Sequence, residues 1–101
     1  ASLADPGADL GVCLAVASSR LDRPVRKGVV VSSEIGLGGE LRPVTHFDLR
    51  QRETAGLGFS ILAGAHNDAE GTGEGAEGYV NLHDSIEGLL SNRKDKGGDW
   101  L

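Results

Sequence analysis

GVVVSSEIGLGGELRPV, residues 28–44, predicts a buried strand, a glycine turn and a returning strand. The β-branched run at residues 29–31 is typical of a strand that is covered on both faces. Gly38 and Gly39 can adopt positive φ at little cost, so the chain can fold back there as a hairpin. Pro43 cannot donate to a sheet ladder, and we expect it to close the returning strand or to lie at an edge.

A helix is expected before this stretch, over residues 9–21. Asp5 suits the N-cap and Pro6 suits the first helical position, where its missing N–H costs nothing. Apolar residues recur at helical spacing, but the other faces are apolar as well, which predicts a helix that is buried on most sides. Pro24 prevents a simple continuation.

A second helix is expected after the hairpin, from residue 47 to about residue 55. Thr45 and Asp48 resemble a capping pair, and the apolar side of the helix is thin, with Phe47 as its main member. A short strand should follow at residues 59–62. A helix between two strands implies a βαβ unit, in which the strands are parallel and the crossover is right-handed.

The remaining third of the chain reads as a loop, a short strand and a helix. Residues 64–78 carry four acidic side chains and no basic one, which predicts a flexible acidic, glycine-rich loop. A last short strand is expected at residues 79–80, and Asn81 should cap an amphipathic helix that ends near residue 90. Residues 91–101 are charged and read as a flexible tail. The predicted fold class is therefore α/β, with a mixed sheet and a βαβ unit packed by two to three helices.

Composition narrows the possible classes of protein. The chain has 101 residues, and 39% of them are apolar, which favours one globular domain. Its net charge of −5 argues against a protein whose whole surface binds nucleic acid. No run is long enough to span a membrane. Cys13 is the single cysteine and should be a buried thiol, which favours an intracellular setting. Because the chain contains no methionine, we expect it to be a piece of a longer polypeptide.

Three segments together carry a family resemblance: DPGADLGVCLAVASSRLDRPV, GVVVSSEIGLGGELRPV and the AGLGF that ends the second helix. They resemble the C-terminal Lon-protease-like domain of the RadA (Sms) family of DNA repair ATPases, from about residue 5 to residue 62 and weakly at residues 79–90. The resemblance implies a partial Lon-like domain over residues 1–90. It also implies a parent that forms a hexameric ring, binds single-stranded or branched DNA and works beside a RecA-type recombinase in branch migration.

The resemblance further implies ATP, Mg and Zn as cofactors of the full-length parent, although this chain has no G-x-x-x-x-G-K-[ST] motif and should have no ATPase activity alone. His46, His66 and His83 lack metal-ligand spacing, so we expect no metal site. The compartment would be the cytoplasm of a bacterium, or the plastid or mitochondrion of a eukaryote.

Lon enzymes use a serine nucleophile and a lysine base, which must lie within hydrogen-bond reach. When this sequence follows the Lon pattern, Gly7 falls on the serine position and Asp48 on the lysine position. Glycine has no side chain, and an aspartate would repel a developing alkoxide. We therefore expect no catalytic residues, and a residual Ser-Lys protease is the disfavoured alternative.

Two groups of charged residues are candidates for binding. Basic side chains that could track DNA phosphates are Arg23, Arg26, Lys27, Arg42, Arg50 and Arg52. Glu34 and Glu40 border the hairpin and could pair with arginines of a neighbouring subunit. Alternatively, the basic side chains are solvent-exposed surface residues without a binding role. The alternative for the whole chain is a stand-alone structural module whose only role is to assemble with other subunits. GEGAEG at residues 73–78 matches the dinucleotide fingerprint in letters, but we expect a strand after it and hence no nucleotide site.

Overall fold

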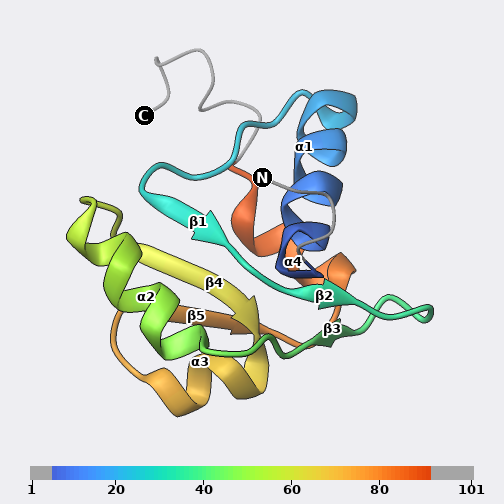
Figure 1. Ribbon diagram of the computed structural model, residues 1–101. Helices are drawn as coiled ribbons and strands as arrows, with labels where there is room; N and C mark the ends of the chain where they lie inside the picture. Colours follow the sequence, from blue (N-terminus) through green and yellow to red (C-terminus); the bar gives the residue numbers. More distant parts are fainter. Residues whose placement is uncertain (1–5, 92–101) are drawn as a thin grey trace.

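A small parallel sheet between two pairs of helices forms the body of the protein (Figure 1). The computed structural model describes residues 6–91. Helices α1 and α4 pack together on one side of the sheet, and α2 and α3 pack together on the other. The elements in chain order are a short 3-10 turn (Pro6–Ala8), α1 (Asp9–Leu21), β1 (Val29–Val31), β2 (Glu34–Ile35), β3 (Leu41–Arg42), α2 (Phe47–Gly56), β4 (Ile61–Ala65), α3 (His66–Thr72), β5 (Ala76–Tyr79) and α4 (Leu82–Leu89).

The sheet has the strand order β1-β4-β5, and both pairings are parallel. Val30 lies opposite Leu62, and Ala63 lies opposite Glu77. The β1-α2-β4 segment is the predicted βαβ unit, so this part of the prediction and the α/β fold class are confirmed. Alternate residues of β4 face the two helix layers: Ala63 belongs to the core cluster of α1 and α4, whereas Gly64 lies against the ring of Phe47 on α2.

The hairpin exists, but its strands differ from the prediction. Residues 29–31 do not pair with the returning strand; β2 pairs antiparallel with β3, with Ile35 opposite Leu41. Val29–Val31 instead lies at an edge of the parallel sheet and is only half-buried, so its expected coverage on both faces is wrong. The glycine turn is confirmed, since Gly39 has a φ of 87°.

Helix α1 has the predicted length but not the predicted burial. Leu10 and Leu14 are buried in the core, while Val12 and Val16 on the opposite side are 50% and 57% exposed. The helix ends at Asp22, whose left-handed φ of 57° lets its N–H bond to the carbonyl of Ser18. The predicted cap Asp5 lies outside the described residues.

Helix α2 confirms the expected element and corrects its cap. No side chain caps its N-terminus, and His46 precedes it with a left-handed φ of 59°. The proposed Thr45 and Asp48 pair is therefore wrong as a capping box. Phe47 is buried, as its position on the thin apolar side predicts.

The segment at residues 64–78 is the largest correction. In place of a flexible loop it contains the end of β4, helix α3 and the start of β5. Ala69 is buried against the sheet, and the Asp68 carboxylate accepts a hydrogen bond from the Val44 N–H at 2.9 Å. These long-range contacts stabilise a helix that its glycine-rich composition disfavours.

Helix α4 is confirmed together with its cap, because Asn81 Oδ1 accepts a hydrogen bond from the Asp84 N–H at 2.8 Å. The strand before it is Ala76–Tyr79 and not residues 79–80. Residues 92–101 of the predicted tail lie outside the described part. Between residues 6 and 91, no helix is both long enough and apolar enough to cross a membrane.

Candidate functional site

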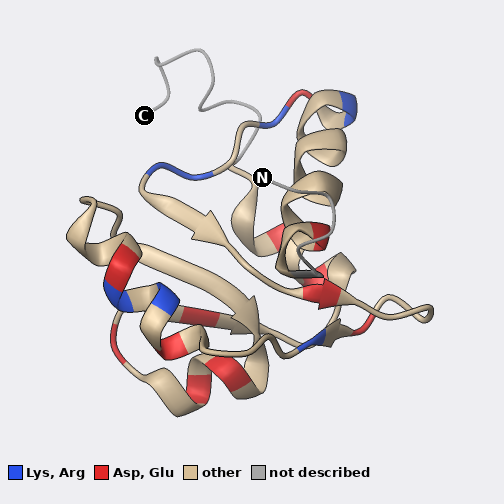
Figure 2. Ribbon diagram, in the orientation of Figure 1, with Lys and Arg blue, Asp and Glu red and all other residues tan. Residues whose placement is uncertain are grey.

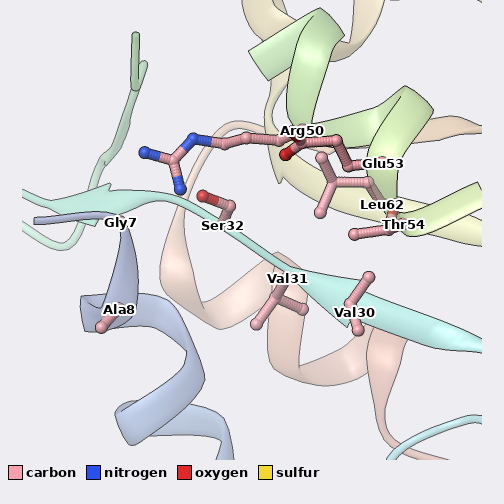
Figure 3. A pocket seen from close by; sticks show the side chains of 9 residues that line it. All are labelled: Gly7, Ala8, Val30, Val31, Ser32, Arg50, Glu53, Thr54 and Leu62. Carbon is pink, nitrogen blue, oxygen red and sulfur yellow. The ribbon is translucent and has the colours of Figure 1, made fainter. Parts of the chain in front are cut away.

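A cleft of about 280 Å³ opens between the start of α1, strand β1 and helix α2 (Figure 3). Its lining residues come from four separate parts of the chain: Gly7, Ala8, Val30, Val31, Ser32, Arg50, Glu53, Thr54 and Leu62. The βαβ unit creates this cleft, because α2 crosses the sheet face next to the edge strand β1. Gly7, which the sequence analysis predicts at the serine position of the Lon pattern, lines this concave surface.

The backbone around Gly7 is fixed by the segment between β1 and β2. The Ser33 N–H donates to the Gly7 carbonyl at 3.1 Å, and the Leu10 N–H donates to the Ser33 carbonyl at 3.1 Å. Both Gly7 and Ser33 are buried. The start of α1 is thus held rigidly against the cleft, although no side chain extends from it at residue 7.

The other side of the cleft carries hydroxyl, guanidinium and carboxylate groups. Ser32 Oγ is buried and has no hydrogen-bond partner among the described residues, and Figure 3 shows the Arg50 guanidinium reaching over it. Thr54 Oγ1 donates to the Gln51 carbonyl at 3.0 Å. Asp48, which the sequence analysis predicts at the lysine position of the Lon pattern, is exposed on α2 and does not line the cleft. The lining residues include Glu53 but neither histidine nor lysine, so they do not contain the Ser-Lys pair of a Lon protease.

Two of the predicted DNA-binding residues take part in the internal structure. Arg23 Nε donates to the Ser91 carbonyl at 2.8 Å, and its Nη2 donates to the Leu90 carbonyl at 3.1 Å. Arg26 Nη1 donates to the Glu77 carboxylate at 2.8 Å and to the Gly88 carbonyl at 2.9 Å. Both arginines therefore connect the segment between α1 and β1 to the C-terminal end of α4, and Arg26 also connects it to β5.

Glu77 connects Arg26 to Tyr79. The Tyr79 hydroxyl donates to the Glu77 carboxylate, which also accepts from Arg26. The pKa of Glu77 is lowered, because its hydrogen bonds to Arg26 and Tyr79 outweigh the larger single effect of burial. Burial, followed by the bond to Glu77, raises the pKa of Tyr79 to about 12, and the bond to Glu77 raises the pKa of Arg26. Sequence reasoning missed this group, because Arg26 and Glu77 lie 51 positions apart.

The hairpin holds an ion pair of its own. Arg42 Nη2 lies 3.0 Å from Glu40 Oε2, and both side chains are about half exposed. The hydrogen bonds from its own backbone N–H and from Arg42 lower the pKa of Glu40. Glu34, the other subunit-contact candidate, is half-buried in β2. Glu40 thus has an arginine partner within the chain as well as an exposed face.

The other three basic candidates lie in two places: Lys27 just before β1, and Arg50 and Arg52 on α2. Lys27 is exposed just before β1, and Arg52 is exposed on α2; within residues 6–91 neither has a hydrogen-bond or ion-pair partner. Arg50 donates to the Thr45 carbonyl at 3.2 Å. Figure 2 shows basic residues at the end of α1, on the segment before β1, on α2 and on β3, whereas the charged residues of α3 are all acidic.

The remaining motifs behave as local structure. GEGAEG at residues 73–78 runs directly into β5, so a strand and not a helix begins within this motif. In the part of the chain that the structure describes, no three histidine, cysteine, aspartate or glutamate side chains gather as metal ligands do.

Comparison with known proteins gives one consistent family name. The chain is 42% identical over 55 residues to the DNA repair protein RadA of Synechocystis, a match that covers 54% of this chain and 11% of that protein. It is 47% identical over 58 residues to RadA of Mycolicibacterium smegmatis (57% of this chain, 12% of the relative) and 39% identical over 69 residues to RadA of Streptococcus pyogenes (68% and 15%). No family model matches the chain. It therefore spans about 11–15% of the length of these relatives, and the predicted resemblance to RadA proteins is confirmed.

Proposed function

We propose that this chain, which is related to a segment of the DNA repair protein RadA, is a non-proteolytic Lon-like module that contacts DNA and neighbouring subunits. The observation that carries the proposal is the identity of 39–47% over more than half of the chain to DNA repair proteins of that name. In this proposal the module acts in DNA repair and recombination, where its parent forms a hexameric ring and extends branched intermediates.

The composition of the cleft supports the non-proteolytic part of the proposal. Gly7 offers no nucleophile at the start of α1, and Asp48 is exposed outside the cleft. A Ser-Lys pair requires both groups within hydrogen-bond reach. We expect no cleavage of casein by the full-length protein in the presence of ATP, and cleavage would restore the protease alternative.

DNA contact is assigned to Lys27 and Arg52. Among the six basic candidates, Arg23, Arg26 and Arg42 have partners within the chain that hold their guanidinium groups in place, whereas Lys27 and Arg52 project from exposed positions. An exposed cation without a partner loses little when it binds a phosphate, because no internal bond is broken. With a net charge of −5, the chain would bind DNA through a local face only.

The test measures the affinity of the 101-residue chain for a fluorescent single-stranded oligonucleotide by anisotropy at several salt concentrations. Lys27→Ala and Arg52→Ala should each weaken binding and lower the slope of log affinity against log salt by about 1. Lys27→Arg and Arg52→Lys keep the charge and should bind as the parent chain does. If both alanine variants bind DNA with the affinity and the salt dependence of the parent chain, Lys27 and Arg52 do not contact DNA.

The full-length parent would supply the rest of the motor. We propose that it contains the ATPase, uses ATP and Mg, binds Zn in a separate domain, and works in the cell beside a RecA-type recombinase. The intact mass of the native protein tests this part: a mass many times 10.5 kDa with a P-loop peptide supports it. A native mass near that of the chain would favour the alternative of a stand-alone assembly module.

A further inference from the structure

The turn between α2 and β4 presents two large apolar side chains to solvent. Leu57 is 77% exposed and Phe59 is 41% exposed. Hydrogen bonds fix the backbone of this turn: the Phe59 N–H donates to the Thr54 carbonyl at 3.0 Å, and Gly58 reverses the chain with a φ of 100°. An aromatic side chain on a fixed backbone loses little conformational freedom when it binds another molecule. Phe59 is therefore suited to a binding contact.

Phe59 lies at the end of the sheet where the parallel strands β1 and β4 begin (Figure 1). The Ser60 N–H donates to the Gly28 carbonyl at 2.8 Å, which holds the segment before β1 beside the turn. This bond brings the exposed Lys27 next to Phe59, although the two are distant in the sequence. Arg52 is exposed on α2, which leads directly into the turn. Cations from two separate elements thus flank the aromatic ring (Figure 2).

Two carboxylates limit what these cations can do alone. Glu53 is exposed on α2 next to Arg52, and Glu74 is exposed in the turn before β5, which begins at the same end of the parallel sheet. This end of the sheet therefore carries little net positive charge, and its attraction for phosphates alone would be weak. Nucleic acid would bind here with useful affinity only if its bases also contribute, and an aromatic ring supplies that contribution by stacking.

We propose that the Phe59 ring stacks on an unpaired base of a DNA strand whose phosphates contact Lys27 and Arg52. In a duplex the faces of the bases are already covered by their neighbours, so a single strand or an unpaired end offers the free face that stacking requires. This inference rests on the proposed DNA contact, and it names the residue that would select single-stranded over duplex DNA. Leu57 in the same turn has no aromatic face and cannot stack in this way.

The first experiment compares the affinity of the 101-residue chain for a single-stranded oligonucleotide and for the duplex of the same sequence, by fluorescence anisotropy. Phe59→Leu keeps an apolar side chain but removes the ring, so it should weaken binding of the single strand by about fivefold or more and leave binding of the duplex unchanged. Phe59→Tyr keeps the ring and should bind as the parent chain does. Leu57→Ala is the matched control and should also bind as the parent does, and urea unfolding verifies that all three variants are folded.

Photo-cross-linking tests the contact between ring and base directly. Irradiation of 5-iododeoxyuridine in a bound single strand joins the base to an aromatic side chain that stacks on it. Mass spectrometry of the digested complex should identify Phe59 as the linked residue. Cross-links found only at other residues overturn the proposal.

The outcomes separate this inference from the proposed function. If Phe59→Leu binds both DNAs as the parent does while Lys27→Ala and Arg52→Ala weaken binding, the phosphate contact stands and the stacking is wrong. If Phe59→Leu weakens binding of the single strand and of the duplex equally, Phe59 supports only the local structure, and the stacking is again wrong. A parent chain that binds neither DNA overturns both this inference and the proposed DNA contact.

Discussion

At the scale of single residues, Tyr79 gives the clearest prediction. The chain contains one tyrosine, so ultraviolet absorbance of the phenolate follows this side chain alone. We expect it to ionise near pH 12, well above the ordinary value near 10, because it is partly buried and donates to Glu77. Glu77→Gln should move the midpoint part of the way back, since burial remains after the charge is removed. An unchanged midpoint in Glu77→Gln would contradict the role of this carboxylate.

The same shift makes stability depend on pH. The pKa of Tyr79 is raised on folding, so the folded state keeps its proton while the unfolded state loses it; the stabilisation is complete below about pH 10 and is lost as the pH rises to about 12. Urea unfolding should show a decline in this window that Tyr79→Phe removes. The difference between the two chains cancels the titration of lysines, which both share.

Helix α3 carries the prediction at the scale of elements. Gly71 lies within α3 with open space around its Cα, whereas a Cβ on Gly78 of β5 would meet His66 Cα at 2.7 Å and Ala69 Cβ at 2.8 Å. Gly71→Ala should raise the free energy of unfolding by about 0.5–1 kcal/mol. Gly78→Ala should lower it by about 1–3 kcal/mol, because the backbone must shift. Denaturant unfolding compares the two; equal effects would mean that residues 66–72 are not helical.

This element also marks how far the sequence could predict the structure. Helices α1 and α4 follow from apolar spacing and, in α4, from the Asn81 cap, which are local signals. Helix α3 depends on distant partners, such as the Val44 N–H that binds Asp68, and composition alone does not contain them. The cleft beside Gly7 was not predicted, because its lining comes from four separate parts of the chain, and the Arg26–Glu77 contact joins positions too far apart for any periodicity to reveal.

At the scale of the whole molecule, the two helix layers should differ in stability. The α1 and α4 side shares a buried cluster with β4 that includes Leu10, Leu14 and Leu89, whereas α2 contributes Phe47 as its buried residue. Segments with few buried apolar contacts open before the rest of a domain. Amide hydrogen exchange should therefore be slowest at Leu62 and Ala63 in the central strand and faster along α2.

Phe47→Ala should increase the difference in hydrogen-exchange rate between the two helix layers. Loss of the ring that packs against Gly64 should cost about 3–4 kcal/mol of packing, and α2 should then exchange many times faster than α1. Leu49→Ala is the control, because Leu49 lies on the same helix but is 44% exposed and should change exchange little. Exchange that rises equally in α1 and α2 would show that the molecule unfolds as one unit. In that case the cleft between α2 and β1 could not open separately from the core.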